Sequence, residues 1–149
     1  MLRIGRNLFV HAGLSARLLE RNLEMDTLNA RMSEGLYRTS KERREDPTLE
    51  FLYRSAGPVW YRGMVCTDEK YDPLTPEQTD ALLRRYDADR LLIGHTIFPD
   101  ISTFHDGRVI AVNVQNERNR RKNRGRAVLI EGSRISVVGN RGVKRVLEE

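Results

Sequence analysis

The sequence predicts an α+β fold, with helices in the first two thirds of the chain and mostly antiparallel strands in the last third. Three observations lead to this prediction: an apolar stripe at helical spacing over residues 25–36, a capping box at residues 75–78, and two successive hairpin patterns after residue 101. A chain of 149 residues with 39% hydrophobic residues is sufficient for one core. We therefore expect a single domain without an internal linker.

The apolar stripe predicts an amphipathic helix from Asp26 to about Arg43. Its apolar residues recur at spacings of three and four on an otherwise polar segment, and they are Met25, Leu28, Met32 and Leu36. Asp46, followed by Pro47, predicts the N-cap of a second, short helix that runs to Tyr53.

A third helix is predicted after Thr75. Thr75 and Gln78 have the spacing of a capping box, and Pro76 stands in the first turn. The helix behind this box presents one apolar face, which is formed by Leu82, Leu83 and Tyr86.

The strand signals are of two kinds. The apolar runs Asn7–Val10 and Leu91–Ile93 predict buried strands. The later signals are hairpins, because pairs of β-prone runs flank short glycine-containing turns; these runs are Ser102–Phe104 with Val109–Val114, and Ala127–Ile130 with Ile135–Val138. Residues Glu117–Arg126 are expected to form a polar, basic loop between strands, exposed to solvent or bordering the active-site cleft.

Composition limits the classes of protein. Lys and Arg number 26 and Asp and Glu 21, so the net charge is +5, which weakly favours phosphate-bearing or polyanionic partners. The single cysteine, Cys66, excludes an internal disulfide framework and indicates a reducing compartment. No apolar run is long enough to cross a membrane. We expect a cytoplasmic protein that does not associate with membranes.

Two of the three histidines occupy equivalent positions. His11 follows the strand Asn7–Val10 and precedes Ala12-Gly13, while His95 follows Leu91–Ile93 and Gly94. Neutral imidazoles on rigid strand ends are good ligands for divalent transition metals, and small neighbours leave room for metal, water and substrate. Two ligands are fewer than the roughly three that a catalytic site usually has, so both a metal site and a structural role stay open from the residues alone.

Four segments, in order, resemble a known family. They are Phe9–Ser15 (F-V-H-A-G-L-S), Gly57–Gly63 (G-P-V-W-Y-R-G), Ile93–Thr96 (I-G-H-T) and Asp106–Ile110 (D-G-R-V-I). Together they resemble the second half of the calcineurin-like metallophosphoesterases, most of all the bacterial and Shewanella-like branch of the serine/threonine protein phosphatases. The resemblance spans about residues 4–138.

This resemblance implies a fold and a chemistry. The chain would be the C-terminal half of a four-layer α/β/β/α sandwich, so that residues 1–149 form a partial domain. It would hydrolyse phosphoesters with water activated by two divalent ions, which could be manganese, iron or zinc. His11 and His95 would bind one of these ions, and Arg62 would contact the substrate phosphate as the catalytic and substrate-binding arginine.

The resemblance also implies that the site is incomplete. The family's D-x-H, G-D-x-x-D-R-G and G-N-H-E motifs are absent from this sequence. We therefore expect the missing N-terminal half to be required for activity on a phosphoprotein or a phosphorylated small molecule. An aspartate such as Asp68 or Asp100 could in principle replace a missing ligand, but neither follows a strand in the manner of the histidines.

Several residues have simpler interpretations. His105 is expected to be a solvated hairpin residue, Trp60 a core residue and Cys66 a small half-buried or buried residue. Arg62 could instead be a surface arginine stacked on Trp60 or Tyr61.

Two alternative functions stay open. One is a dinucleoside tetraphosphatase-like hydrolase. The other is a non-catalytic module that binds through its basic loop, although nucleic acid is not expected as a partner because this loop has no interleaved aromatic residues for base stacking.

Overall fold

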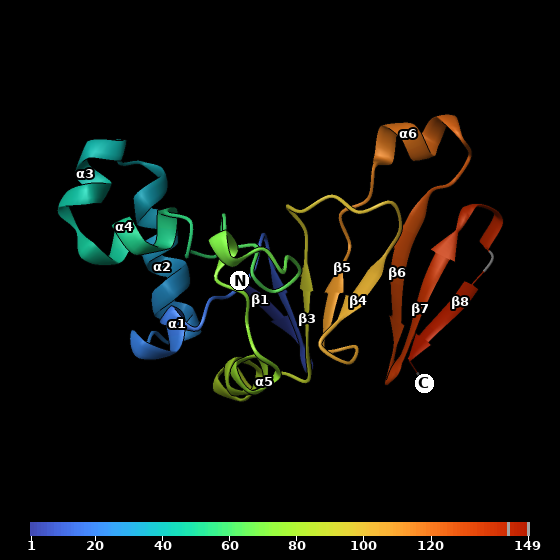
Figure 1. Cartoon of the computed structure of the whole chain (residues 1–149), viewed down its shortest axis with the longest axis horizontal. Helices are drawn as coiled ribbons and strands as arrows, with labels where there is room; N and C mark the ends of the chain where they lie inside the picture. Colours follow the sequence, from blue (N-terminus) through green and yellow to red (C-terminus); the bar gives the residue numbers. More distant parts are fainter. Residues whose placement is uncertain (143, 149) are drawn as a thin grey trace.

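The computed structural model describes residues 1–142 and 144–148, which form two sheets and a helical layer (Figure 1). The larger sheet has the strand order β1-β2-β3-β5-β4 and the smaller one the order β6-β7-β8. The strands are β1 (Leu2–Ile4), β2 (Asn7–Val10), β3 (Arg90–Ile93), β4 (Ser102–Phe104), β5 (Val109–Ala111), β6 (Arg126–Glu131), β7 (Arg134–Gly139) and β8 (Lys144–Glu148). The predicted α+β class is confirmed, while membership of a four-layer sandwich stays a prediction.

The two hairpins of the last third are confirmed. β4 pairs antiparallel with β5, and β6 pairs antiparallel with β7. The centre of the larger sheet is parallel, because β3 lies between β2 and β5 and runs in the same direction as both. β1 adds an antiparallel edge strand through the turn at Gly5, whose φ of 57° suits glycine.

Alternating side chains divide the core between the two faces of the larger sheet. Leu8, Val10, Leu91 and Ile93 pack on the side of the helices. Leu92 and Ile110 face the smaller sheet, where they pack with Ile135 and Val137. This period-two alternation orders the layers as helices, five-stranded sheet and three-stranded sheet.

The helices of the described chain gather mainly at one end of it (Figure 1). They are α1 (Arg17–Glu20), α2 (Met25–Leu36), α3 (Ser40–Glu45), α4 (Pro47–Tyr53), α5 (Pro76–Arg85) and α6 (Asn116–Arg121), with 3₁₀ turns at Glu69–Tyr71 and Asn140–Gly142. None of the helices in the described part of the chain is long and apolar enough to cross a membrane.

The predicted helix Asp26–Arg43 is wrong in its length. α2 ends at Leu36, and α3 starts after Thr39, whose side chain accepts a hydrogen bond from the Glu42 backbone N–H while Glu42 accepts one from the Thr39 backbone. This capping box supplies partners to a new helix N-terminus, so the chain turns rather than continuing straight. Its T-x-x-E pattern was visible in the sequence.

The predicted caps of the other two helices are confirmed. The Asp46 carboxylate accepts hydrogen bonds from the backbone N–H groups of Thr48 and Leu49 at the start of α4. Thr75 and Gln78 make the reciprocal capping box of α5. The predicted loop Glu117–Arg126 is wrong in part, because its first residues lie in α6, where Arg121 and Glu117 pair across one turn.

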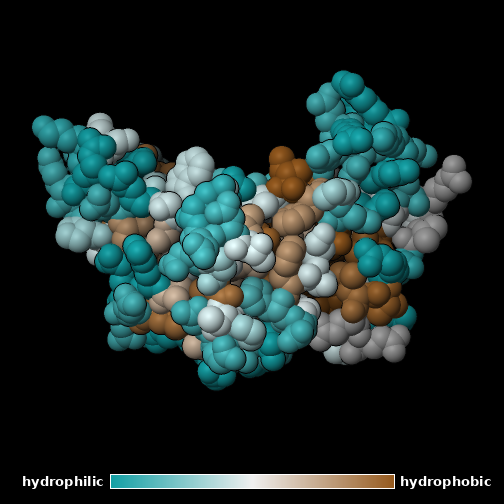
Figure 2. All heavy atoms as spheres, viewed as in Figure 1, coloured by the Kyte–Doolittle hydropathy of each residue, from teal (hydrophilic) through white to brown (hydrophobic). Residues whose placement is uncertain are grey.

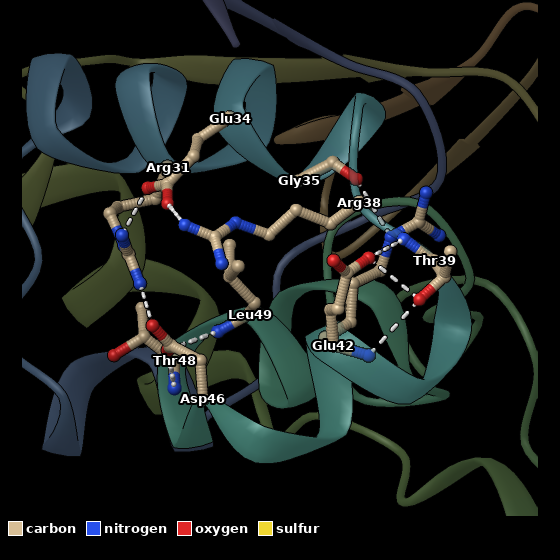
Figure 3. A network of polar contacts seen from close by, with 10 residues as sticks. Arg31, Glu34, Gly35, Arg38, Thr39, Glu42, Asp46, Thr48 and Leu49 are labelled. Carbon is tan, nitrogen blue, oxygen red and sulfur yellow. Dashed lines mark hydrogen bonds and ion pairs between the residues drawn. The ribbon is translucent and has the colours of Figure 1, made fainter.

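A polar network joins α2, α3 and α4 (Figure 3). Arg31 forms ion pairs with Glu34 in its own helix and with Asp46 at the start of α4. Arg38, just beyond the end of α2, forms an ion pair with Glu34. The pKa of Asp46 lies below its ordinary value, first because its carboxylate accepts a hydrogen bond from the backbone N–H of Leu49 and second because it accepts one from Arg31. The network fixes the relative direction of the three helices.

Gly35 provides the close approach between α2 and α4. A Cβ atom at this position would lie 2.3 Å from Cε2 of Tyr53, whose hydroxyl donates to the carbonyl of Met32 at 2.5 Å. Helix interiors normally favour alanine over glycine by about 1 kcal/mol, so this glycine is explained by the tyrosine ring against it.

We predict that Gly35→Ala lowers the free energy of unfolding by about 1–3 kcal/mol in the natural sequence, because the new methyl group overlaps the Tyr53 ring. In a Tyr53→Ala background the same change should instead raise stability, since only the helix propensity gain remains. Urea unfolding of the four proteins measures both effects. The same sign in both backgrounds would contradict this explanation.

Candidate functional site

The candidate site is built on the parallel pairing of β2 with β3. In their register Val10 lies beside Ile93, so the residues that follow the two strands emerge at the same edge of the sheet. The backbone N–H of Gly94 donates to the carbonyl of His11 at 2.9 Å. Residues 84 positions apart in sequence are thereby brought into contact.

His11 and His95 face each other across this edge. Nε2 of His11 lies 3.2 Å from Nδ1 of His95, and the ring centroids are 5.0 Å apart. The predicted juxtaposition of the two histidines is therefore observed. Their role as metal ligands stays a prediction.

The spacing of the two nitrogens is compatible with one shared ion. If each nitrogen lay about 2.1 Å from the ion, a separation of 3.2 Å would subtend about 99°, since half of 3.2 divided by 2.1 is the sine of half that angle. This angle lies between the ideal values for octahedral and tetrahedral coordination, about 90° and 109°. A neutral pair sharing one hydrogen bond has the same spacing, so the geometry allows either state.

The second nitrogen of His95 is buried and has no partner among the described residues. Nε2 of this ring is covered from solvent but makes no hydrogen bond there. Metal-bound imidazoles usually donate their other N–H to a carboxylate or a carbonyl. Nε2 of His95 is therefore an unsatisfied buried polar atom among the described residues.

His95 also has an unusual backbone. Its φ is 59°, in the left-handed region that residues other than glycine seldom adopt. Such a conformation costs about 1–2 kcal/mol and is retained where the surrounding structure imposes it. Here Gly94 and the bond to His11 hold the turn that aims the imidazole at its neighbour.

The segment Gly57–Gly63 forms the third side of the site. The N–H of Ala12 donates to the carbonyl of Pro58 at 3.0 Å, which holds this segment against the residues that follow β2. A Cβ atom at Gly13 would lie 3.1 Å from the carbonyl oxygen of Tyr61, so a small residue suits this approach. The contact places Trp60 and Arg62 next to the histidines.

Trp60 is not a core residue, contrary to the prediction. It is 53% exposed, and its ring packs edge-on against His95 with the centroids 5.2 Å apart. The indole therefore covers one side of the imidazole. The signal for this role in the sequence is the position of Trp60 two residues before Arg62, in the same short segment.

Arg62 is half-buried beside His95. Its guanidinium donates from Nη1 to Oγ1 of Thr96 at 2.9 Å, one residue beyond His95. Burial, followed by the charges of Arg62 and His11, lowers the pKa of His95 below its ordinary value. The imidazole therefore stays neutral near pH 7, and a neutral imidazole has one unprotonated ring nitrogen that can act as a ligand.

His105 belongs to another part of the structure and is not a solvated residue as predicted. Its two ring nitrogens contact Oγ1 of Thr79 at 3.2 Å and the carbonyl of Met64 at 3.0 Å. It thus joins the hairpin turn to α5 and to the loop after Gly63. Cys66 is half-buried, as expected.

The described residues contain no group of three or more His, Cys, Asp or Glu side chains that could hold a metal ion. Asp68 pairs with Lys70, and Asp100 pairs with Arg126 and Arg145. Neither aspartate completes a ligand set with the histidines. Within the described residues, the two histidines therefore have no third ligand of this kind beside them.

An apolar hollow of about 890 Å³ borders the site on the other side of His11. It lies along β1, β2 and β3 and reaches β6; Phe9, Leu92, Val112, Val128 and Ile130 are among its lining residues. At its edge, Leu2 and Ile4 of β1 are 58% and 59% exposed. Figure 2 shows hydrophobic residues at the surface over the strands in the right half of the molecule. The exposed apolar edge of the larger sheet therefore belongs to β1 and not to the strands that end at the histidines.

Comparison with known proteins corrects the predicted family. No family model matches the chain, and no curated protein sequence matches it. Solved structures do match: the cold-active protein tyrosine phosphatase of a psychrophilic Shewanella species, and a single-residue variant of a cold-active protein tyrosine phosphatase. Each has a TM-score of 0.84, 25% sequence identity, and an alignment that covers 95% of this chain and 40% of the other.

The assignment to the calcineurin-like metallophosphoesterases, and to their serine/threonine phosphatase branch, is therefore withdrawn. The similar structures are named protein tyrosine phosphatases, and no model of the predicted family matches. Short motifs such as V-H-A-G and G-H-T carried the assignment, and patterns of so few residues specify local geometry more than family. This chain spans about 40% of the length of the solved chains that it matches.

The left-handed backbone of His95 gives a direct test of how the site is built. We predict that His95→Gly is more stable than His95→Ala by about 1 kcal/mol, because glycine adopts a positive φ without steric cost. Chemical unfolding of both variants measures the difference. At His11, which has no positive φ, the alanine variant should be the more stable one. A preference for alanine at both positions would show that the turn relaxes when the imidazole is removed.

The lowered pKa of His95 gives a second test, in metal-free protein with a chelator present. The folded state disfavours protonation of His95. The free energy of unfolding therefore has its full value above the unfolded pKa of His95, about 6.5, and decreases as the pH falls from there toward the lower pKa of the folded state. We predict that Arg62→Ala raises the pKa of His95, because a neighbouring positive charge is removed. An NMR titration of the imidazole protons measures it, and Arg120→Ala, on α6, should leave it unchanged. An unchanged His95 pKa in Arg62→Ala would show that the arginine does not act on the imidazole.

Proposed function

We propose that this chain forms part of a metal-dependent phosphatase site, in which His11 and His95 bind a divalent cation and Arg62 binds the substrate phosphate. The observation that carries the proposal is the contact of the two imidazoles at 3.2 Å beside a guanidinium without a carboxylate partner among the described residues. The similar solved proteins are named phosphatases, which supports phosphoester hydrolysis as the reaction class.

The residues of this chain have separate roles in the proposal. Arg62 presents a planar set of N–H donors that matches the oxygens of a phosphate, and its bond to Thr96 limits the directions it can take. Trp60 packs against one side of the His95 ring. Divalent ions at such a site, proposed to be two and to be manganese, iron or zinc, would supply an activated water and neutralise phosphoryl charge.

The chain offers donors for one of these ions, so further ligands are proposed to come from additional polypeptide. The apolar hollow along β1, β2 and β3 supports this. The solved chains that match extend well beyond the part that this chain covers. Polypeptide packed over the hollow would reach His11, which lines it. We propose that the chain by itself has little or no phosphatase activity.

Metal titration of the purified chain tests the ligand assignment. We predict that Mn²⁺ or Zn²⁺ binds weakly to the natural sequence and that His11→Ala and His95→Ala each weaken the affinity at least about tenfold, the loss expected for one ligand. Isothermal titration calorimetry measures the affinity. His105→Gln is the matched control, since this histidine bonds to Thr79 and Met64 and should leave metal affinity unchanged.

Hydrolysis of an aryl phosphate with manganese completes the test. The natural chain alone should be nearly inactive, and joining it to the part of a similar solved phosphatase that it does not cover should restore turnover that His95→Ala removes. Equal metal affinity in all the histidine variants, or turnover in the fusion that does not need His95, would reject the proposal.

A further inference from the structure

A second hollow, of about 490 Å³, lies next to the candidate site on the side of Arg62. It is assembled from the start of α1, the end of α4 and the loop over residues 60–72. Trp60 and Arg62 belong both to this hollow and to the site, so a molecule held at Arg62 extends naturally into it. Its other lining residues are Arg17, Tyr53, Arg54, Ser55, Ala56, Tyr61, Lys70, Tyr71 and Asp72.

The hollow carries an excess of positive charge. Four cationic side chains line it against one carboxylate, that of Asp72, which gives 4 − 1 = +3. Two of the cations are already paired outside the lining, Arg54 with Glu50 at 3.3 Å and Lys70 with Asp68 at 2.7 Å. The side chain of Arg17, in contrast, makes no hydrogen bond or ion pair with another residue of the described chain. Its charge is available to an anion that enters the hollow.

The three tyrosines of the hollow do not favour a nucleobase, and its fourth aromatic residue, Trp60, is 53% exposed and packs against His95 at the candidate site. The ring of Tyr53 is covered by the guanidinium of Arg43 at 4.1 Å, and the ring of Tyr71 by the ammonium of Lys70 at 4.9 Å. Tyr61 is buried, with its hydroxyl donating to the carbonyl of Asp72 at 2.5 Å. Base stacking needs an open ring face. The cationic side chains of the hollow and its covered tyrosine rings therefore favour binding of carboxylates over stacking of a base.

We infer that this basic hollow binds an acidic residue of a peptide substrate next to the phosphorylated residue held at Arg62, and that Arg17 selects this acidic residue. The inference rests on the proposed function, because it takes Arg62 as the phosphate-binding residue. A carboxylate entering the hollow meets the guanidinium of Arg17, which can bind both of its oxygens. The ligand class is therefore an acidic phosphopeptide.

The test compares four versions of one peptide. Its central residue is either tyrosine or phosphotyrosine, and the two residues beside it are either both aspartate or both alanine. Fluorescence anisotropy at low salt with the full chain measures the affinities. Both phosphorylation and the aspartates should tighten binding, the aspartates by about three- to tenfold, since charge pairs at an exposed site contribute modestly. Arg17→Ala should reduce the effect of the aspartates to less than twofold, and Arg17→Lys should retain most of it.

Two further variants separate this inference from the proposed function. Arg62→Ala should remove the dependence on phosphorylation and keep the preference for aspartates. Arg120→Ala takes the same charge from an exposed position on α6 and should change neither effect. Binding that ignores phosphorylation in the natural chain would reject the proposed function. A phosphate effect with an unchanged aspartate preference in Arg17→Ala, or tighter binding of a nucleoside triphosphate than of the acidic phosphopeptide, would overturn the inference.

Discussion

The parallel pairing of β2 with β3 is the constraint on which the candidate site depends. Parallel neighbours carry their strand ends to the same edge of a sheet, and the register of Val10 with Ile93 sets the two following segments side by side. The bond from Gly94 to the carbonyl of His11 then continues the ladder one step beyond the strands. Every other part of the site is positioned relative to this edge: Pro58 bonds to Ala12, Arg62 bonds to Thr96, and Trp60 packs on His95.

Local signals in the sequence were sufficient for much of the fold. The capping residues Asp46 and Thr75 and the two glycine-containing turns act through contacts a few residues apart, and the structure contains the elements that they predict. β1 was not predicted, because a three-residue edge strand gives too few positions for a periodic pattern. The apolar stripe does not predict the break between α2 and α3, because this break depends on the competing cap at Thr39.

The sequence indicated residues of the candidate site but not the contacts that surround them. His11 and His95 stood out by position, since each follows a strand beside small residues, whereas Arg62 was indicated by the family resemblance alone. Their neighbours depend on tertiary contacts: Trp60 covers an imidazole, and His105 is tied to Thr79 and Met64. The family could not be predicted from the short motifs, because these describe a local turn geometry. The solved structures that match share the fold with this chain at only 25% sequence identity.

The contact between Trp60 and His95 gives the site its own optical signal. Trp60 is the single tryptophan of the sequence, so all indole emission arises beside the imidazole pair. The ring is half exposed, and its emission depends on the polarity and charge around it. Protonation of His95 and binding of an anion at Arg62 both take place in the immediate environment of this one fluorophore. Events at the edge of the sheet can therefore be followed in the unlabelled protein.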